Sequence, residues 1–309
     1  MKSRRLIVLI LLLMAVASVA QFRRNRFGGS DDDTGIVYTE GGDAVDSQTV
    51  RTAREIASHS TGTPIWTNDP AFERDVFTFV RIKYQRNLDP NLSWSAGHWI
   101  TDFPDSDLNL SFRIQQVTSM RTSPEGRTIK LTDPELFDYP WIYMVEPGRL
   151  HLRDEEVLIL RKYLLNGGVL MADDFWGELQ WKGFADQIKR ALHEDKYKFE
   201  ELPMEHPLFH CVFDIKGPKN KLQTPNSHQG IRSQYDGVTW ERHDGEECTE
   251  MHIRAMNDDK GRIMIIATHN CDNGDGWERE GENDYFFHEF SEKRAYPLGI
   301  NIIFYVMTH

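Results

Sequence analysis

The chain has 309 residues, of which 39% are hydrophobic and 11% aromatic, enough for one large domain or two modest ones with a real core. Its formal net charge is −12, and its first 26 residues hold six basic residues and no acid, so the remainder is more acidic than the whole. Such a surface repels nucleic acid and anionic lipid, which excludes a polyanion-binding role. Three cysteines, none in a Cys-x-x-Cys pair, exclude a zinc ribbon and allow at most one internal disulfide.

The N-terminus has the pattern of an export signal. A basic start precedes an apolar run from Leu6 to Ala20, which is short for a membrane span and typical of a signal-peptide core. Ser18 and Ala20 are small residues at the spacing that signal peptidase prefers, so cleavage after Ala20 is expected. Arginines follow soon afterwards and resist translocation, which makes an uncleaved anchor over residues 6–20 the alternative. Both interpretations predict an exported protein of the periplasm or cell envelope that meets the membrane only through residues 1–20.

A polar stretch comes next. Residues 21–45 are rich in Gly and Asp and predict a flexible linker. Residues 46–59 predict a short helix, which the segment 61–70 ends. We therefore assign residues 21–74 to a linker with a short helix.

Strand and helix patterns alternate after residue 75. Strands are predicted at 76–82, 128–131, 141–145 and in the apolar run that ends at Asp173, and helices at 104–117, 154–165 and 178–192. The first of these helices is expected to turn Leu108, Phe112 and Val117 inward. The alternation predicts one α/β domain over residues 75–309, with a mostly parallel sheet that carries helices on both faces.

The pattern weakens between residues 204 and 250, which predicts an insertion or lid. Residues 251–256 and 262–268 predict two strands joined by a hairpin turn at 258–261. Residues 295–307 predict a final helix packed on the sheet.

Polar side chains follow three of the predicted strands. Asp173 and Asp174 end the apolar run of 168–172, Glu146 follows 141–145, and His269 follows 262–268. Ligands of open α/β sheets bind beyond the carboxyl ends of the strands. If these strands are parallel, the four side chains meet at one edge, where carboxylates and a histidine could do general acid–base work or hold a divalent cation.

Asp173 and Asp174 are expected to play different parts, because neighbouring strand residues point to opposite faces. We expect Asp174 to cap the following helix and Asp173 to face the cleft. The alternative is that Asp173 is the helix cap and that His269 is a half-buried histidine with satisfied hydrogen bonds.

The segment after His269 adds two candidate metal ligands, Asp272 and Asp275. Its composition is like that of a calcium loop, but the EF-hand spacing is absent, so an Asx-rich turn is preferred. The candidate ligands for a divalent cation are Asp173, His269, Asp272 and Asp275. No motif for any other cofactor is present, and acids after Cys271 argue against a reactive thiol there.

Three blocks of sequence carry a family resemblance: Tyr139-Pro140-Trp141-Ile142-Tyr143, the run 160–168 that ends in Asn-Gly-Gly, and Asp173-Asp174-Phe175-Trp176-Gly177. With these, the chain resembles the bacterial domain-of-unknown-function family numbered 4159 over about residues 75–309. The resemblance implies a flavodoxin-like sheet, as in the class I glutamine-amidotransferase group, and an envelope setting. It implies no activity, and Glu146-Pro147-Gly148 stands where an amidotransferase would carry its nucleophilic cysteine.

Two functions remain open at this point. The first is an exported ligand-binding or assembly module of the bacterial cell envelope, with an envelope protein or a glycan as partner. The second is an exported hydrolase of a glycan or related substrate, which would use Glu146, Asp173, Asp174 and His269, with or without a metal.

Overall fold

The computed structural model describes residues 35–72, 75–87, 98–193 and 195–309. The predicted signal or anchor segment lies outside these residues. Within them, no helix is both long and apolar enough to cross a membrane.

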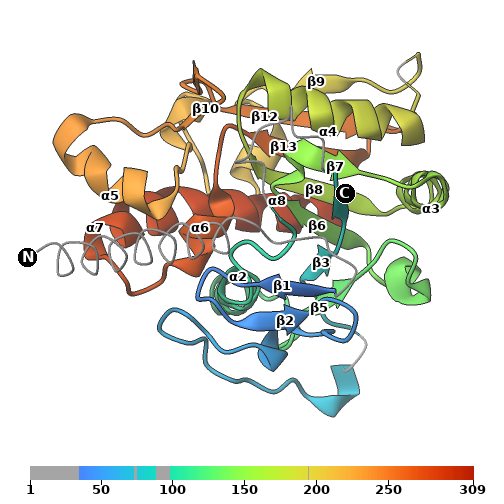
Figure 1. The fold of residues 1–309 in the computed structure, drawn as a ribbon, viewed down its shortest axis with the longest axis horizontal. Helices are drawn as coiled ribbons and strands as arrows, with labels where there is room; N and C mark the ends of the chain where they lie inside the picture. The colour runs from blue at the N-terminus through green and yellow to red at the C-terminus, as the bar shows by residue number, and fades with distance from the viewer. Residues whose placement is uncertain (1–34, 73–74, 88–97, 194) are drawn as a thin grey trace, which may run out of the picture.

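A central sheet organises the described chain (Figure 1). Its seven strands lie in the order β5 (Arg127–Ile129), β3 (Val80–Ile82), β6 (Trp141–Val145), β8 (Val169–Phe175), β13 (Ile263–His269), β12 (His252–Asn257) and β9 (Phe199–Glu201). The first five run parallel, and β12 is antiparallel to both of its neighbours. The predicted α/β class with a mainly parallel sheet is therefore confirmed, while the flavodoxin-like topology stays a prediction.

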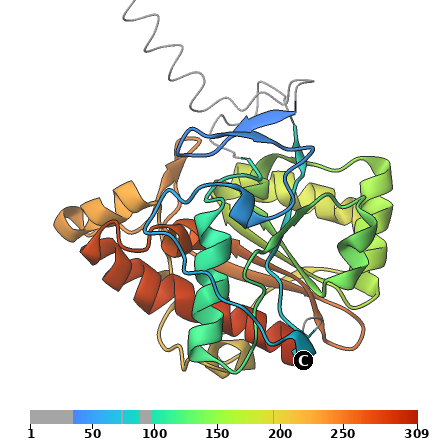
Figure 2. The same ribbon diagram turned by 90° about the horizontal axis from the view of Figure 1, so that it is seen from below.

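The two middle strands are apolar because both of their faces are covered. Every residue of β6 and β8 is buried, as expected for central strands of a parallel sheet. On β8, Leu170 packs into the core beneath α3 (Asp154–Leu165) and α4 (Gly177–Ala191). Its neighbour Met171 packs into the opposite core, beneath α2 (Asp105–Val117), α6 (Asn273–Glu278) and α8 (Tyr296–Thr308). Helices thus cover both faces, as Figure 2 shows.

The remaining elements are short. The helix α7 (Asp284–Phe286) leads through a π-helix (Phe287–Ala295) into α8. The strands β4 (Gln85–Arg86) and β7 (Leu150–His151) pair with each other. Short 3-10 turns lie at Pro70–Phe72, Pro134–Asp138, Pro147–Arg149, Pro207–His210 and Lys219–Lys221. Residues 204–250 also contain α5 (Ser227–Asp236) and the hairpin of β10 (Arg242–His243) and β11 (Glu246–Glu247). Gln223 ties this segment to the sheet, because its Nε2 donates to the carbonyls of Cys248 and Asn270.

The N-terminal part differs from the expectation of a linker. Residues 36–46 form a hairpin of β1 (Ile36–Tyr38) and β2 (Ala44–Asp46), and Val37 and Val45 are buried in the core. The helix expected over 46–59 is wrong, since only a 3-10 turn forms, at Ala53–Glu55. Tertiary hydrogen bonds take the place of helical ones here. The amide of Thr128 donates to the carbonyl of Arg51, and the amide of Ala53 donates to the carbonyl of Glu125.

Two details of the predicted elements also need correction. The strand at 76–82 forms ladder pairs only from Val80 onward, while Phe77 makes an isolated bridge to Thr122. In α2, Val117 is 44% exposed and Phe112 is only partly buried, whereas Ile114 is buried. The first two turns of α2 are covered on all sides, so a single inward stripe does not describe this helix.

Candidate acidic site at the carboxyl edge of the sheet

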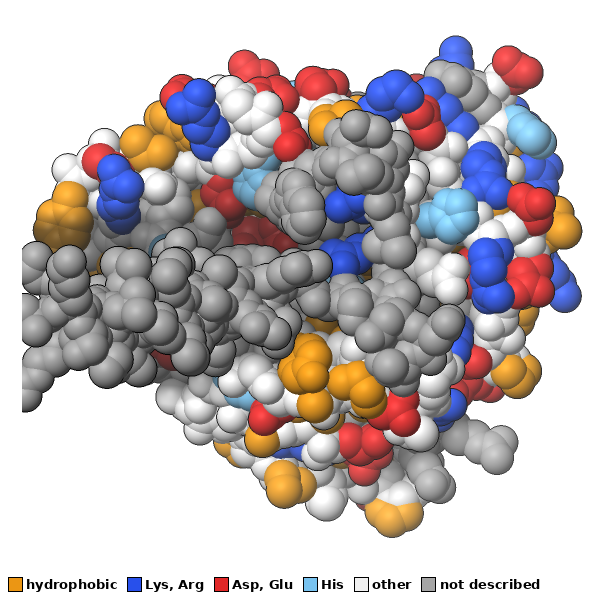
Figure 3. All heavy atoms as spheres, in the orientation of Figure 1, with side chains coloured by type: hydrophobic (Ala, Val, Ile, Leu, Met, Phe, Trp, Pro, Cys, Tyr) orange, Lys and Arg blue, Asp and Glu red, His pale blue; other side chains and the backbone are white. Residues whose placement is uncertain are grey.

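The carboxyl ends of three neighbouring strands, β6, β8 and β13, lie side by side. Val145 of β6 and Thr268 of β13 are both in register with Asp173 of β8. Glu146 and Asp174 therefore leave adjacent strands side by side, and the amide of Glu146 donates to the carbonyl of Asp173 at 2.8 Å. Figure 3 shows acidic side chains set back in a hollow on one face of the molecule.

The backbone around this edge is left-handed at four non-glycine positions. The φ angles are 61° at Asp102, 47° at Glu146, 55° at Asp174 and 59° at Asn270. Asp and Asn tolerate this conformation best, but such residues are uncommon and gather at functional sites. Glu146 and Asn270 directly follow β6 and β13, Asp174 is the last residue but one of β8, and Asp102 precedes α2.

Three aspartates form the centre of the site, which we call the inner triad. Asp102, Asp174 and Asp272 each offer a carboxylate oxygen, and these oxygens lie within 4.8 Å of one another. All three residues are buried, with exposures of 1%, 7% and 4%. Burial, reinforced by the neighbouring carboxylates, raises the pKa of each well above its usual value. Negative charge in the inner triad is thus disfavoured unless a cation joins it.

One oxygen of the inner triad has no hydrogen-bond partner among the described residues. Asp102 Oδ2 is buried and none of the described residues donates to it. The charge of Arg81 lowers the pKa of Asp102, but its hydrogen bonds go elsewhere. Its Nε and Nη2 bind Asp107, and its Nη1 binds the carbonyls of Trp99 and Thr101. A buried carboxylate oxygen without a donor is costly, and a cation at this position would offset that cost.

Asp272 and Asp174 are held in place by hydrogen bonds. Asp272 Oδ1 accepts from the amide of Asp275 at 2.7 Å and so caps α6. Asp174 Oδ1 accepts from Trp176 Nε1 at 2.8 Å. Asp174 accepts no backbone N–H at the start of α4, so the expectation that it caps that helix is wrong.

Asp173 has the structural part instead. Its carboxylate accepts from Thr268 Oγ1, Tyr143 Oη, Asn273 Nδ2 and the amides of Asn273 and Gly274, at 2.5 to 3.2 Å. Burial raises its pKa to about 6, and these hydrogen bonds oppose a larger shift. Asp173 therefore joins β8 to the start of α6, and the expected roles of Asp173 and Asp174 are reversed.

His269 does not join the carboxylates. Its Nε2 lies 3.0 Å from the carbonyl of Gly177, and its ring packs against Phe175, Trp181 and His252. Phe175 and Trp181 belong to the core beneath α4, on the face opposite to Asp173. Burial lowers the pKa of His269 to about 3, so it is a neutral core histidine. The expected convergence thus holds for the acids and fails for His269.

Glu146 lies beside the inner triad. Its Oε2 accepts from the amide of His98 at 2.8 Å and from Thr101 Oγ1 at 2.5 Å. Burial raises its pKa to about 7, although both hydrogen bonds act in the other direction. The charge of Glu146 also raises the pKa of Asp174, second only to burial.

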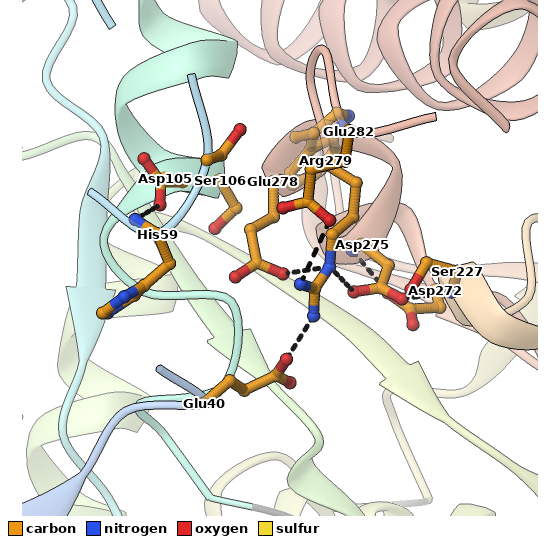
Figure 4. A network of polar contacts seen from close by, with 12 residues as sticks. Glu40, His59, Asp105, Ser106, Ser227, Asp272, Asp275, Glu278, Arg279 and Glu282 are labelled. Carbon is orange, nitrogen blue, oxygen red and sulfur yellow. Dashed lines mark hydrogen bonds and ion pairs between the residues drawn. The ribbon is translucent and has the colours of Figure 1, made fainter. Parts of the chain in front are cut away.

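A second group of carboxylates, the outer trio, lies next to the first. It consists of Glu40, which follows β1, with Asp275 and Glu278 of α6. Figure 4 shows the guanidinium of Arg279 among these three side chains, with Asp272 close by. The outer trio therefore already contains a positive charge, unlike the inner triad.

The hairpin of the 204–250 segment forms one wall of the site. His243 of β10 stacks on Trp176, with ring centroids 5.6 Å apart, and its Nε2 lies 2.8 Å from Glu241 Oε2. Glu246 Oε2 accepts from the amide of Glu178 at the start of α4. The hairpin is thus fixed to the site through Trp176 and to the start of α4 through Glu178.

A separate hollow lies at the other edge of the sheet. It is lined by the turns at 165–167 and 258–263 and by the end of α8, including Tyr305 and His309. None of the inner triad or outer trio lies there.

Fold and site together define an α/β protein with a buried, all-oxygen acidic site at the carboxyl ends of its parallel strands. The chain belongs to the domain-of-unknown-function family DUF4159, whose sequence profile matches residues 78–307. A search of curated proteins finds no match. The matched region contains the whole inner triad, whereas Glu40 of the outer trio lies before it.

Proposed function

We propose that this chain is an exported divalent-cation-binding domain that holds a ligand of the bacterial cell envelope through its bound ion. The observation that carries the proposal is the inner triad, and above all Asp102 Oδ2, a buried carboxylate oxygen to which none of the residues that the structure describes donates a hydrogen bond. A divalent ion among the three aspartates would supply the missing positive partner.

The donor set selects the class of ion. Carboxylate oxygens suit Ca²⁺, Mg²⁺ and Mn²⁺, whereas zinc sites usually use His and Cys. His269 faces the other core, and burial raises the pKa of the Cys271 thiol well above its usual value. His269 therefore points away from this site, and the protonated Cys271 thiol is a poor metal ligand.

Three protein carboxylates leave coordination positions for further ligands, because these ions take six or more oxygen donors. A partner that offers hydroxyl or carbonyl oxygens, such as a glycan or a peptide segment, would complete the coordination. The surrounding acids disfavour a polyanionic ligand. A binding role needs only the ion, while the hydrolase alternative also needs a general acid or base, for which Glu146, with its pKa raised to about 7, is the candidate.

The envelope setting rests on the sequence of the first 26 residues, with its basic start and apolar run. Fractionation of cells that express a tagged full-length chain tests it. We expect the protein in the periplasmic or membrane fraction, and a soluble cytoplasmic pool of the full-length chain would contradict the setting without affecting the ion site.

Isothermal titration calorimetry of chelator-treated protein tests the ion. We expect saturable binding of Ca²⁺ or Mn²⁺ to the wild type, with at least about tenfold weaker binding to Asp102→Asn and Asp272→Asn. Asp186→Asn is the matched control, because Asp186 lies on the outer face of α4 with its side chain 44% exposed and pairs there with Lys182. Folded wild-type protein that binds no divalent ion would overturn the proposal.

A further inference from the structure

The inner triad and the outer trio meet the same geometric condition. In each group three carboxylate oxygens from three residues lie within 4.8 Å of one another. The groups are also adjacent, since Asp272 of the inner triad caps the turn of α6 that carries Asp275 of the outer trio. Two neighbouring carboxylate groups of this kind are the arrangement of a two-cation site.

Arg279 is what distinguishes the two groups. Its Nε lies 2.8 Å from Glu278 Oε2 and 3.2 Å from Asp275 Oδ1, and its Nη2 pairs with Glu40. Its Nη1 lies 3.6 Å from Glu282 Oε2 at the margin of the group. The guanidinium thus contacts every member of the outer trio, as the dashed lines in Figure 4 show.

The charge of Arg279 is fixed in this place. Burial alone would lower its pKa, but Asp275, Glu278 and Glu40 outweigh burial and raise it above its usual value. A guanidinium is always protonated in proteins and presents several N–H donors in one plane. It therefore acts as a permanent cation, in contrast to a metal ion, which can leave.

We propose that Arg279 is the built-in cation of the outer trio, so that the site takes one divalent ion, in the inner triad, and excludes a second. The expected number of one ion per chain rests on the proposed function, whereas the exclusion of an ion from the outer trio can be tested separately. It assigns Arg279 as the residue that sets the metal stoichiometry of the site.

The same arginine fastens the N-terminal hairpin to the site. Glu40 lies in the loop between β1 and β2, and its partner Arg279 lies 239 positions later in the chain. Because Glu40 precedes the family-matched region, this third carboxylate of the outer trio comes from a segment outside that region. Loss of the Arg279 charge would leave Glu40, Asp275 and Glu278 as an unneutralised group open to a metal ion.

Equilibrium dialysis against millimolar Mn²⁺ with elemental analysis of the folded protein tests the inference. We expect one Mn²⁺ per chain in the wild type and two in Arg279→Gln. Electron paramagnetic resonance gives a second measurement: isolated Mn²⁺ in the wild type, and a spin-coupled pair in the variant.

Arg113→Gln is the matched control. Arg113 pairs with Glu280, next to Arg279 in sequence, and is also partly buried, but it contacts no member of the outer trio. It should bind one ion. Arg279→Lys keeps the charge and should also bind one.

The outcomes separate the two proposals. One ion in folded Arg279→Gln beside one in the wild type overturns the inference, as do two ions in the wild type. No ion in the wild type with one in Arg279→Gln overturns the proposed function and supports the inference, and none in either overturns both. If Arg279→Gln is unfolded without metal, Mn²⁺ should restore its circular dichroism spectrum, and a chain that stays unfolded in Mn²⁺ counts against the inference.

Discussion

Asp102 Oδ2 occupies the space that a side chain at position 274 would need. A Cβ added to Gly274 would lie 1.9 Å from this oxygen, far inside van der Waals contact. Gly274 belongs to the first turn of α6, and its amide also donates to Asp173. The glycine therefore lets a residue ahead of α2 and a residue of α6 meet at the carboxyl edge of the sheet.

Gly274→Ala should displace Asp102 and weaken cation binding by at least about tenfold. Gly276→Ala is a suitable comparison, because its Cβ would meet Ala295 Cβ at 2.4 Å, on the same helix but away from the acids. We expect both variants to lose thermal stability and only Gly274→Ala to lose Mn²⁺ affinity in calorimetry. Equal affinity losses in the two would show that α6 packing, not the position of Asp102, controls the site.

Asp102→Asn should stabilise the metal-free protein while it impairs cation binding. The change removes a buried carboxylate whose Oδ2 has no donor in the described part of the chain, so the free energy of unfolding should rise by about 1–3 kcal/mol near neutral pH. Asp107→Asn, on the same helix entry, breaks a buried pair with Arg81 and should cost about 3–5 kcal/mol. Urea unfolding in chelator measures both. A destabilised Asp102→Asn would mean that Asp102 is a structural residue.

Asp173→Asn should be the destabilising member of the Asp173–Asp174 pair. Asparagine can replace only one of the two acceptor oxygens, which leaves buried donors of Asn273 or Thr268 without a partner. The expected loss is about 1–3 kcal/mol, against little change for Asp174→Asn. Thermal melts in chelator decide the order, and a larger loss for Asp174→Asn would contradict the structural role given to Asp173.

The stability of the metal-free protein should fall as the pH rises from about 4.5 to about 7. Burial raises the pKa of Glu146 from 4.5 to about 7 and that of Asp173 from 3.8 to about 6. At these groups the folded state binds more protons than the unfolded state across this window, so each step upward in pH costs stability. His269, whose pKa is lowered from 6.5 to about 3, acts in the opposite direction below pH 6.5, but it is one group against Glu146, Asp173 and the three aspartates of the inner triad, whose pKa values are also raised. Glu201, whose pKa is lowered from 4.5 to about 2, loses its contribution only below this window.

A divalent cation should reverse this trend, because it competes with protons for the same carboxylates. Ca²⁺ or Mn²⁺ should raise the melting temperature more at neutral pH than near pH 5. Urea titrations and melts across this range measure both effects. Stability that rises with pH in chelator, or a cation effect independent of pH, would contradict the electrostatic account of the edge.

The sequence was sufficient to predict the sheet edge but not the full set of acids. Alternation of apolar strands with helices placed Glu146, Asp174 and Asp272 near one another, because carboxyl ends of neighbouring parallel strands coincide. Asp102 was missed because it follows no strand, and only the fold brings it to α6. Its sole local signal is an acid-rich entry to a helix.

Two other errors have specific physical causes. The alternation of side chains along β8 was used to assign Asp173 and Asp174, but φ of 55° at Asp174 breaks the pleat and turns Phe175 toward the other core. The strand-end argument also predicts His269 beside the acids, but alternation along β13 points it the other way: Ala267 lies in the core beneath α4, Thr268 donates to Asp173, and His269 turns back toward Phe175 and α4. A left-handed residue cannot be inferred from apolar periodicity, whereas the face of His269 follows from the strand alternation itself.

The presence of an ion in the inner triad is tested most directly by anomalous diffraction from crystals soaked in Mn²⁺. The account predicts one anomalous peak at about 2.0–2.6 Å from carboxylate oxygens of Asp102, Asp174 and Asp272 together, and none within the outer trio, where Arg279 stands. A map without a peak among these three aspartates, in crystals that take up Mn²⁺ elsewhere or not at all, would contradict it.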